Sequence, residues 1–132
     1  MNNIYTSYQE LIKPAFAPPA YLFGPVWTVL YILIAISFGY VAYKYFKGKI
    51  SFEILLPFIL NLIFNFSFTY IQFGLKNLPL ASIDILLTLT TLIWAISVIY
   101  KKYKWVTLVN IPYLLWVSFA TILQLTITYL NL

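Results

Sequence analysis

Four side chains with indole, phenol or amide groups stand where the sequence is otherwise apolar. Trp27 and Tyr31 are four residues apart, so a helix places both rings on one face. Asn61 and Asn65 are also one turn apart. Aromatic rings can stack on a planar apolar molecule, and amides can supply a few directed hydrogen bonds. These positions are therefore candidate contacts of a small-molecule binding site.

The chemistry of the chain is limited by the residue types that it lacks. Its 132 residues contain no histidine, no cysteine and only three carboxylates. The commonest general base and the thiolate metal ligands are therefore absent. The sequence also contains no nucleophile–base pair and no nucleotide-binding loop. We expect no ordinary enzyme activity, no catalytic residue, no metal site and no required cofactor.

The overall composition is that of a membrane protein. Apolar residues make up 63% of the chain and charged residues 8%, against about 25% charged residues in soluble domains. Four apolar runs of about 23 residues are each long enough to cross ~30 Å of hydrocarbon. We predict an all-α bundle of four transmembrane helices in one domain, residues 1–132, with a lead segment at 1–19. The predicted helices cover about 21–43, 50–73, 78–100 and 105–129.

The distribution of the lysines predicts the orientation. The net charge of +5 comes from lysines alone, and six of the eight lie in two loops: Lys44, Lys47, Lys49, Lys101, Lys102 and Lys104. Only Lys13 and Lys76 belong to the opposite side. The positive-inside rule then places both termini outside. Residues 1–19 do not form a secretory signal, and the all-lysine basic set favours a bacterial inner membrane.

Polar residues at membrane depth usually face the interior of a bundle, because lipid cannot hydrogen-bond to them. Helical spacing groups such residues into four seams, which we expect to face one another and to line a cavity. The seams are Phe23, Trp27, Tyr31 and Phe38; Asn61, Asn65, Phe68 and Gln72; Asp84, Thr88, Thr91 and Ala95; and Tyr113, Trp116, Ala120 and Gln124.

Each candidate has a structural alternative. Asn61 and Asn65 can act only as interhelical hydrogen-bonding groups. Trp27 can belong to an interfacial aromatic belt. Asp84, the one carboxylate that lies beyond the first turn of a predicted span, can bond a neighbouring helix end or the lead segment, or it can couple proton movement.

Three ordered motifs resemble one known family, over residues 5–131. They are Lys13-Pro14…Pro18-Pro19…Phe23-Gly24-Pro25-Val26-Trp27-Thr28-Val29-Leu30-Tyr31; Asn61-Leu62-Ile63-Phe64-Asn65…Gln72-Phe73…Ala81-Ser82-Ile83-Asp84; and Ile111-Pro112-Tyr113-Leu114-Leu115-Trp116-Val117-Ser118-Phe119-Ala120-Thr121. The sequence is similar to the TspO/MBR family, also called the translocator protein, tryptophan-rich sensory protein or peripheral benzodiazepine receptor family.

The resemblance implies a helical bundle whose pocket binds tetrapyrroles, such as protoporphyrin and haem, and benzodiazepine- or isoquinoline-type ligands. By position, Trp27 and Trp116 would be the pocket tryptophans, Asn61 and Asn65 its polar contacts, and Ala120 the small residue beside the ligand. The family also implies light-dependent porphyrin degradation, for which the two indoles would be the candidates. The candidate ligand contacts are Phe23, Trp27, Tyr31, Asn61, Asn65, Phe68, Asp84, Trp116 and Ala120.

The sequence departs from the family pattern in several places. Members usually have five spans, and the first is missing, since residues 1–12 cannot cross a bilayer. Phe68 stands where many members have tryptophan, and the C-terminus lacks the basic residue of the proposed sterol motif. Without the first helix one wall of the bundle is missing, and we expect a second copy of the chain to close it as a homodimer.

Three functions remain open at this point. The first is a tetrapyrrole-binding membrane protein that acts as a sensor, carrier or scavenger. The second is a small proton-coupled multidrug exporter, with Asp84 as the coupling carboxylate. The third is a scaffold subunit that binds no ligand. No nucleic-acid partner is expected, because the lysines are confined to the loops between apolar runs.

Overall fold

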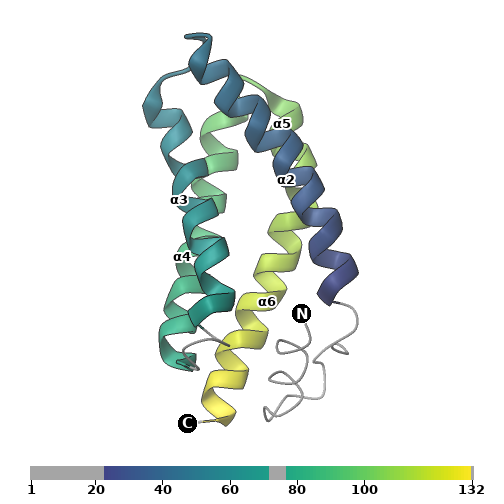
Figure 1. Cartoon of the computed structure of the whole chain (residues 1–132), viewed down its shortest axis with the longest axis vertical. Helices are drawn as coiled ribbons and strands as arrows, with labels where there is room; N and C mark the ends of the chain where they lie inside the picture. Colours follow the sequence, from purple (N-terminus) through teal and green to yellow (C-terminus); the bar gives the residue numbers. More distant parts are fainter. Residues whose placement is uncertain (1–22, 72–76, 132) are drawn as a thin grey trace.

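The computed structural model describes residues 23–71 and 77–131, and all the regular secondary structure in these two ranges is helical. Its elements are α2 (Phe23–Phe46), α3 (Phe52–Thr69), α4 (Leu78–Ile99), α5 (Lys104–Val109) and α6 (Ile111–Leu130). The four longer helices run up and down along the long axis of the molecule (Figure 1). The predicted all-α bundle is confirmed.

The helices differ in whether they can span a bilayer. Within the described ranges, Gly24–Phe46, Leu78–Ile99 and Ile111–Leu130 are long and apolar enough to cross a membrane. A fourth apolar helix, Phe52–Phe68, is shorter. The 18 residues of α3 rise about 27 Å, close to the ~30 Å of a hydrocarbon core. The bundle therefore has three long apolar helices and one shorter one.

Local signals set two of the helix ends. Asn77 caps α4, because its side-chain oxygen accepts a hydrogen bond from the Leu80 amide at 3.0 Å. Helix α2 ends at Phe46, three residues past the predicted end, and the chain turns away at Gly48. That glycine has a φ of +73°, a left-handed conformation that closes helices and strains other residues.

The predicted helix over 105–129 is two helices, and this prediction needs correction. Helix α5 ends at Val109 and α6 begins at Ile111, with Asn110 between them. Pro112 explains the break, because it has no amide hydrogen and its ring would clash with the carbonyl of Leu108 in a continuous helix. At the break, the Asn110 side-chain nitrogen donates to the Val106 carbonyl at 2.8 Å and to the Ser37 hydroxyl at 2.9 Å. The break is thereby tied to α2.

The apolar core lies between α2, α3, α4 and the α5–α6 pair. Phe38 of α2 and Phe58 of α3 meet edge to face at 4.8 Å, and both are buried. Helix α4 packs against both α3 and α6, which makes it the central helix. Val41, Leu92 and Val106 are fully buried around it. The core thus holds α3, α4 and α6 most closely together, and α2 makes fewer contacts with them.

Candidate functional site

The predicted polar seams meet in the interior, where the two α3 amides bond to neighbouring helices. The Asn61 amide nitrogen donates to the Thr88 carbonyl at 2.9 Å and to the Thr91 hydroxyl at 3.3 Å. Its oxygen accepts from the Tyr113 hydroxyl at 2.8 Å. Asn61 is 0% exposed. Its amide is therefore occupied by α4 and α6.

Asn65 continues the same chain of hydrogen bonds toward α2. Its amide nitrogen donates to the Tyr113 hydroxyl at 2.6 Å, and its oxygen accepts from the Tyr31 hydroxyl at 3.3 Å. The chain thus runs from α2 through α3 and α6 to α4. The seams face one another as predicted, but these side chains bond to one another instead of lining an open slot.

Four aromatic rings gather where α2 approaches α6. Trp27 lies 5.4 Å from Tyr31, 6.5 Å from Tyr113 and 6.4 Å from Trp116, measured between ring centroids. The two indoles are nearly perpendicular, at 88°, which is a favoured edge-to-face arrangement. Trp116 also contacts Phe119 at 5.9 Å. Trp27 thus belongs to a partly buried cluster that packs against the core.

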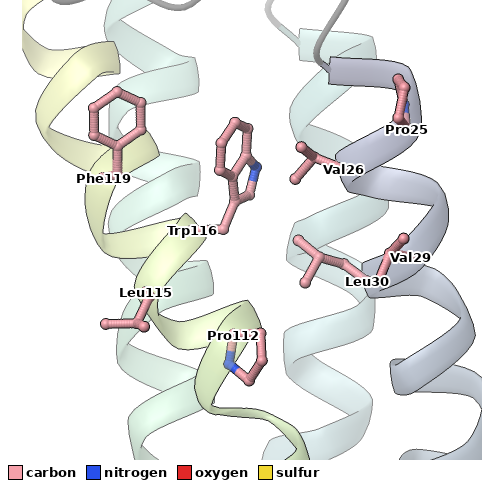
Figure 2. Close-up of a pocket in the computed structure, with 8 residues that line it drawn as sticks. All are labelled: Pro25, Val26, Val29, Leu30, Pro112, Leu115, Trp116 and Phe119. Atoms are coloured by element: carbon pink, nitrogen blue, oxygen red, sulfur yellow. The ribbon is translucent and has the colours of Figure 1, made fainter.

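A groove with a volume of about 560 Å³ lies beside this cluster. It is lined by Pro25, Val26, Val29 and Leu30 of α2 and by Pro112, Leu115, Trp116 and Phe119 of α6. Figure 2 shows Trp116 projecting from α6 toward α2, with Val26 and Leu30 projecting toward it. This volume is within the roughly 300–1,000 Å³ of small-molecule sites, but the groove is open, because Pro25, Val29, Pro112 and Leu115 of its lining are exposed. We call this feature the α2–α6 groove.

The predicted site residues fall into three sets. Trp116 lines the α2–α6 groove, and Trp27 and Tyr31 stand beside it through their ring contacts. Asn61 and Asn65 lie deeper, in the hydrogen-bond chain. Phe68 and Ala120 are half-buried and pack against the core. The side chain of Phe23 lies outside the described part of the structure, as do Gln72, Lys13 and Lys76.

Asp84 is buried in the second turn of α4, and its position is unusual. It is 5% exposed, and its Oδ2 atom has no hydrogen-bond partner among the described residues. The neighbouring Thr88 hydroxyl bonds to the Asp84 backbone carbonyl instead, at 3.0 Å. A carboxyl group in such a place is costly inside a membrane and is retained mostly for a function.

The apolar lining of the groove was not among the predicted contacts. Positions 25, 26, 29 and 30 share one face of α2, and positions 112, 115, 116 and 119 share one face of α6. The one available sequence signal is this spacing beside a tryptophan. A lipid-facing stripe of a helix has the same apolar composition, so the sequence cannot distinguish a groove wall from a lipid-facing surface.

Comparison with known proteins places these features in a family. The TspO/MBR family pattern matches residues 1–130. The chain is 44% identical to the tryptophan-rich protein TspO of Bacillus cereus over 130 residues, which cover 96% of this chain and 81% of that protein. It is 38% identical to the TspO of Archaeoglobus fulgidus, covering 98% of this chain and 82% of that protein.

A human protein is also similar. The chain is 31% identical to the human translocator protein over 127 residues, which cover 89% of this chain and 70% of that protein. The match spans the groove, the tryptophan pair and the hydrogen-bond chain alike. The motifs, the apolar helices and these comparisons agree, and the chain belongs to the TspO/MBR family.

Proposed function

We propose that this protein binds tetrapyrroles such as porphyrin or haem, and other hydrophobic ligands, within the membrane as a sensor, carrier or scavenger. Relatives bear the names tryptophan-rich sensory protein and translocator protein, which describe sensing and transport. The observation that carries the proposal is the Trp27–Trp116 pair, whose rings meet at 6.4 Å beside the α2–α6 groove.

The groove suits a planar, largely apolar molecule. Its lining is apolar apart from one indole, so it favours van der Waals contact with a ring face. The sequence has no histidine and no cysteine, so haem iron would have neither an imidazole nor a thiolate ligand here, and contacts with the faces and edges of the macrocycle would carry the binding. The same features fit metal-free porphyrin equally well.

A titration with protoporphyrin IX tests the proposal. Protein in nanodiscs is titrated while the Soret absorbance of the pigment is followed, since this signal does not depend on tryptophan emission. Trp27→Leu and Trp116→Leu should each weaken binding about two- to twelvefold, because each removes a ring contact of roughly 0.5–1.5 kcal/mol.

Trp94→Leu is the matched control. Trp94 lies on α4, is 42% exposed and does not line the groove, so this variant should bind like the parent chain. Circular dichroism melting checks that all variants fold. No binding by the folded parent chain would favour the scaffold role, whereas equal affinity in the folded Trp27 and Trp116 variants would place the ligand outside the α2–α6 groove.

One observation favours a second candidate, proton-coupled export of hydrophobic cations. The buried Oδ2 atom of Asp84 has no partner in the described part of the chain, which is the condition of a carboxyl group free to exchange a proton. Export that is driven by a pH gradient and abolished by Asp84→Asn would support this function. Unchanged export, or none in the parent chain, would exclude it.

The membrane setting follows from the same features. We propose a bacterial inner membrane with both termini outside, because six lysines gather at the opposite end of the bundle. A homodimer stays a prediction. Large apolar side chains on the outer faces of α2 and α3, such as Ile32 and Phe66, are available for such a contact.

A further inference from the structure

A half-buried lysine with three aromatic neighbours lies at the end of the bundle where α2 meets α5. The Lys44 ammonium stands 5.3 Å from the ring centroid of Tyr40, 5.9 Å from that of Tyr43 and 5.7 Å from that of Tyr103. Tyr40 is braced edge to face by Tyr103 at 5.2 Å and by Trp105 at 4.9 Å. We call Lys44 and its three tyrosines the Lys44 cage.

The cage restricts a side chain that is normally mobile. Cation–π contacts contribute about 0.5–1 kcal/mol at exposed sites, and three of them share this ammonium. A free lysine loses up to roughly 2 kcal/mol of rotamer entropy when it is fixed by a ligand. Lys44 has already lost much of that freedom, so its charge is preorganised for a partner.

The partner is not a carboxylate of the described chain. Residues 23–71 and 77–131 contain two carboxylates, Glu53 and Asp84, and neither forms an ion pair with Lys44. Five more lysines lie at the same end of the bundle: Lys47, Lys49, Lys101, Lys102 and Lys104. This end therefore carries an excess of positive charge, and one of its ammonium groups is held by three rings.

The cage carries hydrogen-bond donors that its ring contacts do not use. An ammonium has three N–H groups, and ring faces do not replace a hydrogen-bond acceptor. The hydroxyl groups of Tyr40, Tyr43 and Tyr103 form no hydrogen bond to another described residue. A cluster of N–H and O–H donors at a membrane–water boundary matches the oxygens of a phosphate group.

We propose that the Lys44 cage binds the phosphate of an anionic phospholipid headgroup. Lys44 lies in the last turn of a helix that is long enough to span the membrane, which sets it at headgroup depth. Trp105 and the tyrosines are the residues that concentrate at this depth. The positive-inside rule explains why lysines lie here, but it does not explain why one of them is held by three rings.

Native mass spectrometry of the full chain tests the site. Protein is released from nanodiscs that contain equal amounts of phosphatidylglycerol and phosphatidylcholine, and the retained lipids are counted. The parent chain should keep one phosphatidylglycerol. Lys44→Gln should reduce its occupancy about fivefold, a change of ~1 kcal/mol, because it removes the one charged donor that the cage holds in place. Tyr103→Leu, which keeps every charge, should reduce it at least twofold.

Lys49→Gln is the matched control. Lys49 is exposed at the same end and contacts no ring, so its loss changes the charge but not the cage. It should lower the occupancy less than twofold. Equal losses in Lys44→Gln and Lys49→Gln would show a diffuse charge effect and overturn the proposal. Displacement of the lipid by millimolar inorganic phosphate would assign the cage to a soluble anion, and this result would also overturn the proposal.

Discussion

The hydroxyl of Tyr113 on α6 donates a hydrogen bond of 2.8 Å to the side-chain oxygen of Asn61 on α3. The same hydroxyl accepts a bond of 2.6 Å from the Asn65 amide nitrogen, one turn further along α3. One phenol oxygen thus joins two amides of a facing helix. Tyr113 and Asn61 are 0% exposed and Asn65 is 5% exposed, so neither amide can bond to water if the phenol oxygen is removed.

Tyr113→Phe should destabilise the bundle. The ring volume is kept, but the Asn61 oxygen and one Asn65 N–H lose their partner in a buried place. Leaving such groups unsatisfied costs about 1–3 kcal/mol, and hydrogen bonds within membranes average ~0.6 kcal/mol, so we expect a loss of about 1–2 kcal/mol. The measurement is reversible unfolding in mixed micelles with increasing SDS.

Tyr129→Phe is the control for this change. Tyr129 is 76% exposed and lies near the end of the same helix. Its variant should unfold within about 0.5 kcal/mol of the parent chain, as surface substitutions usually do. If Tyr113→Phe is as stable as Tyr129→Phe, the hydrogen-bond chain does not stabilise the fold.

The bond between Ser37 and Asn110 should couple α2 to the break between α5 and α6. The Asn110 amide donates to the Ser37 hydroxyl at 2.9 Å, and both residues are fully buried. In a double-mutant cycle, Ser37→Ala and Asn110→Ala should show an interaction energy of about 0.5–1.5 kcal/mol. SDS unfolding of the two single variants and the double variant gives this value, and additive losses would refute the coupling.

The sequence predicted the helices well because their signals are local. Asn77 and Pro79 mark the start of α4, and both act within one turn of the chain. The break at Asn110 was missed, although Pro112 was visible. Proline is tolerated inside membrane helices when neighbouring groups satisfy the freed backbone, as at Pro57 within α3, so a proline alone does not decide between a kink and a break.

The site was predictable only in part, for a physical reason. Polar residues in a span must find partners, so Asn61 and Tyr113 could be assigned to the interior. Whether they contact a ligand or each other depends on interhelical distances that no spacing rule supplies. Val26 and Leu30 could not be told from lipid-facing residues, because a groove wall and a lipid-facing surface have the same apolar composition.

Filling the α2–α6 groove should block ligand binding without harming the fold. Val26 projects into the groove from α2 (Figure 2). Val26→Trp would occupy much of that space, so protoporphyrin affinity should fall at least about tenfold, a change of ~1.4 kcal/mol. Soret titration in nanodiscs measures it. Ile32→Trp is the control, since Ile32 is 55% exposed and outside the groove. Equal affinities in both variants would place the ligand elsewhere.

Cysteine cross-linking tests the predicted homodimer. The natural sequence has no cysteine, so each introduced thiol is the only one in its chain. One exposed position is available on each outer face: Ile32 on α2, Phe66 on α3, Ile93 on α4 and Ile122 on α6. A specific dimer should cross-link at one or two of these faces in native membranes, and the yield should persist when the protein is diluted with lipid.

Val106→Cys, at a fully buried position, should give no cross-link. Monomer at all four positions would contradict a dimer that brings any of these outer faces together.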